Sequence, residues 1–242
     1  MNKNICLASV LTLTLLALGP RPTPAQAVSE EQLTMVAENM HEQLTRIGTI
    51  KSAIIAGKLE DAREPALWLA DSETVAGLPA NFEPFIAQMK AYARHVIMAE
   101  DLVSAAESVS KMAKTCGNCH SVNGVDLEFG YDRLPREDVE DVVTHMQRHQ
   151  WAADRLWDGL IGPSDNAWNR GVDMLIDVPL ASEDVTTASE HYPKLSGITR
   201  RIHALGGIGT ETVTPEARSE LFGEVLGLCA GCHTLLGRGP SN

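Results

Sequence analysis

Apolar residues recur at helical spacing along most of the chain, and no segment shows the alternation that is typical of a β-strand. The tetrad Ser29-Glu30-Glu31-Gln32 has the form of a capping box, and the stripe that follows it predicts a long first helix. The members of this stripe are Leu33, Val36, Met40, Leu44, Ile47, Ile50 and Ile54. Gly57 is expected to end the helix, and three more helices are expected over 60–72, 82–100 and 101–120. This part of the chain therefore predicts a four-helix unit.

The same order of elements returns after residues 121–135, a segment rich in Gly, Asn, Asp and Pro that has the composition of a linker. Pro135 suits the first turn of the next helix, and Ser164 and Thr214-Pro215-Glu216 suit the starts of two later ones. A further helix is expected over 182–205. The apolar stripe of the first helix in this second unit consists of Val139, Val142, Met146, Ala153, Leu156 and Leu160.

The first helices of the two units align weakly when one is shifted by 106 residues. The shift pairs Met40 with Met146 and Ile55 with Ile161, which suggests an internal duplication, although two unrelated bundles of one design would look similar. We therefore expect an all-α fold of two tandem four-helix bundles, over 28–122 and 136–242, joined by a linker over 123–135.

Residues 1–27 have the features of a signal peptide that export removes. Lys3 precedes an apolar run from Ile5 to Leu18, and Ala25-Gln26-Ala27 resembles a cleavage site. The run is too short to span a bilayer comfortably, although an uncleaved anchor is an alternative, and no later segment is apolar enough to cross a membrane. The sequence thus predicts an exported, periplasmic protein without stable membrane insertion.

The charge balance limits the classes of partner. The whole chain has a formal net charge of −12, and without residues 1–27 it keeps 18 basic and 32 acidic residues, a formal charge of −14. An acidic protein lacks the basic patches that bind nucleic acid. The charge instead favours brief docking with basic surfaces of redox proteins, although acidity also serves solubility alone.

Four of the five cysteines form two copies of one motif, Cys-x-x-Cys-His. The first copy is Cys116, Cys119 and His120, and the second is Cys229, Cys232 and His233. On a helix the positions i, i+3 and i+4 share one face, so the two thiols and the imidazole of each motif point the same way. This arrangement suits two thioether bonds to haem c and a histidine bond to its iron.

Other chemistries explain the two motifs less completely. A single Cys₄ zinc site would leave the two histidines unexplained, and a redox-active dithiol is typical of a βαβ context that this sequence lacks. The motifs therefore predict two covalently bound haem c groups, with His120 and His233 as the proximal iron ligands.

A four-helix bundle with Cys-x-x-Cys-His on its last helix resembles the class II c-type cytochromes, which comprise cytochrome c′ and its low-spin relatives. The resemblance covers residues 28–242, because each of the two units resembles one bundle of the family. The tandem arrangement therefore departs from the usual single-bundle member. It implies that the first helix covers the distal face of the haem. There, either an apolar residue leaves the iron five-coordinate or a methionine binds it.

Met40 and Met146 are the distal candidates in this chain, since both lie on the apolar stripe of a first helix. A methionine in such a stripe is also a common core residue. Neighbouring histidines offer bis-histidine ligation as the alternative: His41 in the first unit, and His145 and His149 in the second.

The axial ligands determine the expected function, because a filled sixth position restricts the iron to electron exchange. The sequence favours a periplasmic dihaem electron carrier that is not an enzyme. One alternative is a five-coordinate protein that binds nitric oxide or carbon monoxide, and a weaker one is a dihaem peroxidase or other oxidoreductase. No acid–base group tied to a site supports an enzyme.

Overall fold

The computed structural model describes residues 30–72, 78, 80–130, 134, 142–177 and 191–237. These residues form eight α-helices and no strand, which confirms the all-α prediction. Two short 3₁₀ helices, Glu60–Ala62 and Ala80–Phe82, precede α2 and α3. The α-helices are α1 (Glu30–Ile55), α2 (Arg63–Asp71), α3 (Glu83–Met98), α4 (Leu102–Asn123), α5 (Val142–Ile161), α6 (Asp165–Asp177), α7 (Tyr192–Gly209) and α8 (Pro215–Leu236).

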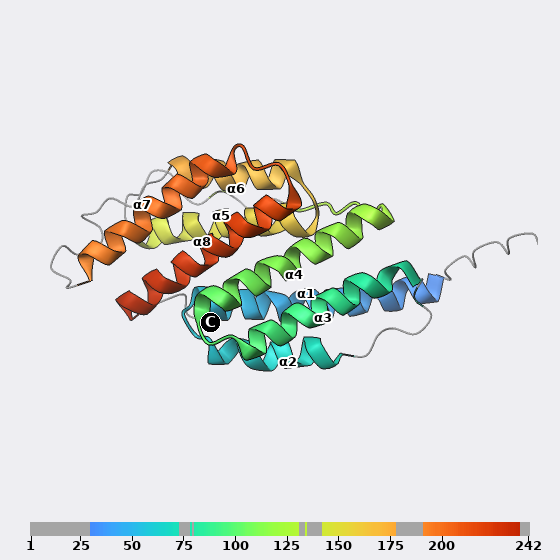
Figure 1. Ribbon diagram of the computed structural model, residues 1–242. Helices are drawn as coiled ribbons and strands as arrows, with labels where there is room; N and C mark the ends of the chain where they lie inside the picture. The colour runs from blue at the N-terminus through green and yellow to red at the C-terminus, as the bar shows by residue number, and fades with distance from the viewer. Residues whose placement is uncertain are drawn as a thin grey trace, which may run out of the picture.

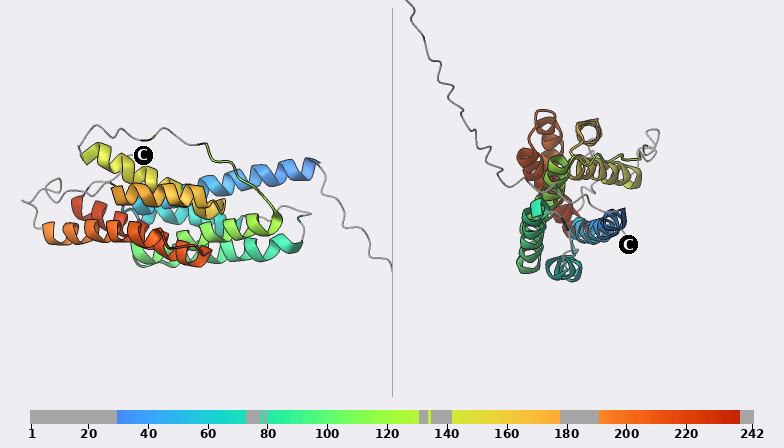
Figure 2. Two further views of the ribbon diagram at one scale, coloured as in Figure 1. Left: turned by 90° about the horizontal axis from the view of Figure 1, so that it is seen from above. Right: turned by 90° about the vertical axis from the view of Figure 1, so that its right-hand side faces the viewer.

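We call α1–α4 the first half and α5–α8 the second half. Helices α4 and α8 pack against each other in the middle of an elongated molecule, with α1–α3 on one side of this pair and α5–α7 on the other (Figures 1 and 2). The two helices that carry the Cys-x-x-Cys-His motifs therefore form the centre of the molecule.

Most helix ends lie where the sequence predicts them. Gly57 follows α1 with a φ of +75°, a left-handed conformation that glycine adopts without steric cost. The side chains of Asp101, Ser164 and Thr214 each accept a hydrogen bond from the backbone N–H three residues later, as N-caps do. These local signals set the lengths of the helices and so the positions of the motifs on α4 and α8.

Four details of the sequence prediction are wrong. Leu44 is 42% exposed, because Gln43 takes the inward position and donates a hydrogen bond to Asn39. Val142 is 44% exposed, since α5 turns Thr144 and its neighbours inward at that end. Helix α4 continues to residue 123, the first position of the expected linker, and α7 continues to residue 209 rather than 205.

Some predictions concern residues outside those that the structure describes. These are the signal peptide over 1–27, the cap at Ser29, the linker residues 131–133 and 135, the helix start with Val139, and residues 182–190 of the expected third helix.

One continuous hydrophobic core joins the two halves. Buried residues from all eight α-helices belong to it, including Ile54 of α1, Met112 of α4, Leu156 of α5 and Phe222 of α8. The sequence predicts two tandem bundles joined by a linker, and it does not indicate that they share a core. Because the core is shared and closely packed, a change in packing in one half can alter the packing of the other half.

Helices α4 and α8 run antiparallel with small residues at their closest approach. The Ser110 hydroxyl donates to the Ser219 carbonyl, and a Cβ on Gly223 would lie 3.3 Å from Glu107 Cα. One turn further along, Lys114 forms an ion pair with Glu216 at 3.6 Å. These small side chains let the two backbones approach closely, which sets the register of the two motif helices.

Within the described ranges, no helix combines the length and apolar character needed to cross a membrane.

Candidate functional site: two Cys-x-x-Cys-His motifs

The first motif occupies the last turns of α4. Cys116, Cys119 and His120 lie at i, i+3 and i+4 of a continuous helix and therefore share a face, as the sequence predicts. Gly124 ends the helix in a left-handed conformation with a φ of +65°, and its N–H contacts the carbonyls of His120 and Ser121. The motif is thus held on a capped, regular helix.

The second motif has the same setting at the end of α8. Cys229, Cys232 and His233 again share one face, and Gly237 ends the helix with a φ of +64°. The N–H of Gly237 contacts the carbonyls of His233 and Thr234, the positions equivalent to those in the first motif. The two motif helices therefore end in the same way.

Both motif histidines are oriented by the same kind of hydrogen bond. The Nδ1 atom of His120 lies 2.6 Å from the Ile161 carbonyl oxygen, and the Nδ1 atom of His233 lies 2.6 Å from the Ile55 carbonyl oxygen. A carbonyl oxygen only accepts, so each Nδ1 atom must carry the proton and donate it. In the neutral imidazole this tautomer leaves Nε2 as the electron-pair donor, which is the state needed to bind a metal.

The four cysteines are free thiols in the structure. Desolvation, together with the neighbouring cysteine of each pair, raises the pKa of the Cys116 and Cys229 thiols to about 12. Desolvation also raises the pKa of Cys119 and Cys232. Redox-active Cys-x-x-Cys pairs instead have a lowered thiol pKa, so these environments do not suit a dithiol catalyst.

The four cysteines do not converge on one metal site. In the α4–α8 register, Cys116 and Cys229 lie at opposite ends of the pair, about 15 residues or ~20 Å apart at 1.5 Å per residue. Among the residues that the structure describes, no group of three or more His, Cys, Asp or Glu side chains is placed to hold a metal ion. A single Cys₄ zinc site is therefore incompatible with this packing.

In the second half, the structure brings the predicted distal methionine close to the motif. Met146 of α5 packs on the buried Leu195 of α7, and so do Cys232, Leu235 and Leu236 of α8. Met146 is half-buried in this small apolar cluster, which is separate from the main core. The arrangement keeps Met146 as a candidate distal ligand, and its role as apolar filler remains the alternative.

The histidines beside Met146 form a chain of contacts between α5 and α7. The Nε2 atoms of His145 and His149 are 3.0 Å apart, and the His149 ring lies 6.2 Å from that of His203, between ring centres. The Nδ1 atom of His203 is 2.7 Å from the Leu175 carbonyl. Sequence reasoning assigned no role to His203, because a single histidine on the third helix of the second unit was its only signal.

The first half differs at the equivalent positions. Met40 is half-buried on α1, while His41 is exposed, so the burial pattern favours Met40 as the inward candidate. A shift of 106 residues aligns Asn39 with His145 and Gln43 with His149 in the sequence. Gln43 Nε2 donates a hydrogen bond to Asn39 Oδ1 at 2.7 Å. A neutral amide pair thus replaces the histidine pair, and the two halves are not chemically equivalent.

Sequence reasoning missed the carbonyl groups that orient the motif histidines. Ile55 ends α1 and Ile161 ends α5, and the 106-residue shift pairs them as equivalent positions. Their equivalence is visible in the sequence, but their contact with the motif of the opposite half depends on how α4 packs on α8. Every residue has a backbone carbonyl, so the residue types in the sequence do not show which carbonyl accepts the hydrogen bond.

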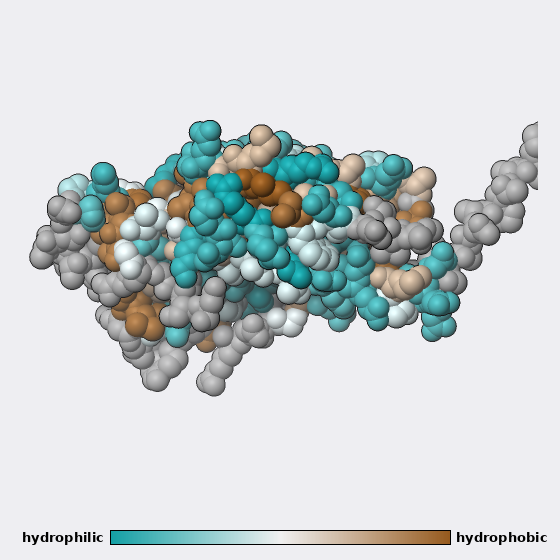
Figure 3. Space-filling model, turned by 90° about the horizontal axis from the view of Figure 1, so that it is seen from below, coloured by the Kyte–Doolittle hydropathy of each residue, from teal (hydrophilic) through white to brown (hydrophobic). Residues whose placement is uncertain are grey.

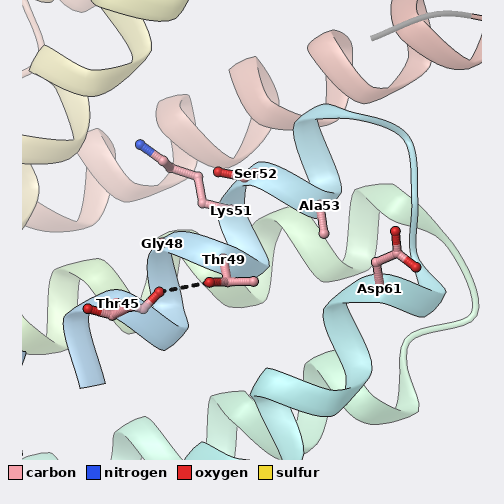
Figure 4. Close-up of a pocket in the computed structure, with 7 residues that line it drawn as sticks. All are labelled: Thr45, Gly48, Thr49, Lys51, Ser52, Ala53 and Asp61. Atoms are coloured by element: carbon pink, nitrogen blue, oxygen red, sulfur yellow. Dashed lines mark hydrogen bonds between the residues drawn. The ribbon is translucent and has the colours of Figure 1, made fainter. Parts of the chain in front are cut away.

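A depression of about 430 Å³ lies on α1 beside Asp61, and none of the motif residues line it (Figure 4). Thr45, Gly48, Thr49 and Ser52 form much of its surface, and Thr49 Oγ1 donates to the Thr45 carbonyl. Threonine and serine side chains of this kind are common on the solvent-exposed face of a helix. The depression is open and carries no cluster of reactive groups.

The chain was compared with protein-family models, curated proteins and solved structures, and none of them matched.

Proposed function

We propose that the chain is a dihaem c-type cytochrome that carries electrons between redox partners. The observation that supports this proposal best is the pair of matching bonds from the Nδ1 atoms of His120 and His233 to backbone carbonyls, each 2.6 Å long. A histidine ligand in a metalloprotein donates its second ring N–H in this way, which fixes the ring and raises its basicity.

The residues of each motif fit haem c in type and placement. Two cysteines and one histidine share a helix face, and Cys116, Cys119, Cys229 and Cys232 are half-buried thiols. Covalently bound haem would supply one-electron Fe(II)/Fe(III) exchange at each motif. The protein's part is to bind and orient the group, to limit its contact with water and to present a surface for docking.

We further propose that the halves are tandem four-helix bundles related by duplication. Pro84 and Pro193 lie in the first turns of α3 and α7, and Gly124 and Gly237 end α4 and α8 alike. The matching ends and prolines support this duplication more strongly than the weak identity of the first helices. Each half then holds one haem near the end of its last helix.

Met40 and Met146 are the proposed distal ligands. The contact of both Met146 and Cys232 with Leu195 supports this assignment in the second half. With both distal positions filled, the protein exchanges electrons without binding a substrate at iron. A bis-histidine site at His149 is the alternative in that half, and it has no equivalent in the first half, where Gln43 occupies the position.

The proposed partners are redox proteins with basic docking surfaces, and the proposed location is the periplasm. The face shown in Figure 3 is hydrophilic over much of its described surface, with smaller hydrophobic areas. An acidic, largely polar surface suits brief encounters that are steered by charge.

A redox titration followed by absorbance tests the proposal. Two reversible one-electron steps with low-spin haem spectra are expected. Stoichiometric carbon monoxide binding to both reduced haems would instead show open sixth positions and favour the gas-binding alternative. Peroxide turnover with a reduced dye would favour an enzyme.

A further inference from the structure

Each motif histidine donates its orienting hydrogen bond to a backbone carbonyl of the opposite half of the molecule. His120 belongs to α4, whereas its acceptor, Ile161, ends α5. His233 belongs to α8, whereas its acceptor, Ile55, ends α1. Two independent bundles would each orient their own histidine, so this reciprocal exchange is a property of the assembled chain.

The contacts next to the two hydrogen bonds are close. A Cβ on Gly117, the residue after the first motif cysteine, would lie 2.0 Å from the Leu160 carbonyl oxygen. Gly57 just after α1 lies beside the second motif, where a Cβ would be 2.6 Å from Thr234 Oγ1. In both places the end of a first helix is in direct contact with the motif helix of the other half.

Further contacts hold the halves in this register. Lys51 of α1 pairs with Asp154 of α5 at 2.7 Å, and the Lys51 ammonium lies 5.1 Å from the centre of the Trp157 ring. The Ser110 and Ser219 hydroxyl oxygens are 3.0 Å apart in the buried contact of α4 with α8. The ends of α1 and α5 are thus fixed relative to the motif that each one contacts.

We infer that each half sets the reduction potential of the haem in the other half, through the backbone carbonyls of Ile55 and Ile161. This inference rests on the proposed function, because it requires haem at both motifs. An Nδ1–H group that donates to a carbonyl makes the imidazole a stronger electron donor, and a stronger donor favours Fe(III). Weakening the bond from His120 to Ile161 therefore raises the potential of the haem in the first half. Weakening the bond from His233 to Ile55 raises the potential of the haem in the second half.

Two glycine variants of the full dihaem protein test this coupling. In Gly117→Ala the new methyl group must push α4 away from the Leu160 carbonyl, which adjoins the Ile161 acceptor. Alanine is compatible with the motif itself, since Ala230 occupies the equivalent position of the second copy. In Gly57→Ala the positive φ and the Thr234 contact displace the end of α1.

Gly207→Ala is the matched control outside both motifs. Gly207 is exposed on α7, and its Cβ would meet no other part of the described structure within 4 Å. All three proteins and the parent are compared by haem content, thermal unfolding and a potentiometric titration that resolves the two haems.

We expect Gly57→Ala and Gly117→Ala each to raise one midpoint potential, and to raise different ones. A tenfold change in the Fe(III)/Fe(II) equilibrium corresponds to 59 mV for one electron. Gly207→Ala leaves both midpoints at the parent values. The sign is informative, because loosened packing that admits water stabilises Fe(III) and lowers the potential instead.

The possible failures can be told apart. A parent protein without haem would overturn the proposed function together with this inference. Two bound haems whose midpoints stay constant, fall, or shift equally in both glycine variants would overturn the coupling and leave the electron carrier intact.

Discussion

Replacing Asp154 with asparagine tests the ion pair that links α1 to α5. Asp154 Oδ1 lies 2.7 Å from the Lys51 ammonium, whose side chain is 9% exposed and lies over the Trp157 ring. Asp154→Asn removes the counter-charge of an almost buried cation. Breaking a fully buried pair costs roughly 3–5 kcal/mol, and because the Asp154 side chain is 39% exposed, water reduces this to about 2 kcal/mol.

For a chain of this size that loss corresponds to a decrease in Tm of about 4–8 °C. The assay is urea unfolding of the parent, Asp154→Asn, Lys51→Met and the double variant, which gives the coupling energy of the pair. We expect the double variant to be more stable than the sum of the single losses predicts, by about 1–2 kcal/mol. Glu224→Gln, in the exposed pair with Arg201, is the control and should change stability by less than about 0.5 kcal/mol. Additive losses, or an Asp154→Asn variant as stable as the control, would refute a stabilising role for this ion pair.

Three further predictions concern the haem ligands and the core. The weak long-wavelength sulfur-to-iron band of the oxidised protein should lose one contribution in Met40→Ala and another in Met146→Ala, and its absence from the parent would exclude methionine ligation. His149→Gln, which introduces the residue type of the first half, should leave both haems low-spin in absorbance spectra. A high-spin haem in that variant would identify His149 as the ligand instead. Phe222→Ala should destabilise the protein by about 3–5 kcal/mol in urea unfolding, because Phe222 is fully buried, whereas Leu67→Ala at a 51% exposed position should cost far less; equal losses would contradict the shared core.

Local signals in the sequence were sufficient to predict the helices. Gly57, Asp101 and Thr214 mark helix ends through their own backbone or side-chain chemistry, which depends on few neighbours. The apolar stripe was less exact: Leu44 is exposed because the neighbouring Gln43 turns inward and satisfies its amide on Asn39. A hydrophobic pattern shows which residue types prefer burial, and it does not show which polar residues find a partner.

The placement of each motif on one helix face could also be predicted, since it depends only on helical spacing. The partners of the motif histidines could not. The acceptors are backbone carbonyls at Ile55 and Ile161, and their positions follow from the packing of α4 on α8. The same holds for Lys51, a buried cation in an apolar stripe whose partner lies 103 residues away. Contacts of this range depend on the assembled fold.

The proposed function requires that both Cys-x-x-Cys-His motifs carry covalently bound haem. Its most direct test is the intact mass of the protein made in a host that matures c-type cytochromes, combined with peptide mapping of the two motifs and a haemochrome spectrum. We expect a chain with two haem masses, one on Cys116 and Cys119 and one on Cys229 and Cys232, and no titratable thiol among these four residues. An unmodified chain whose four cysteines all react with a thiol reagent after denaturation would contradict it.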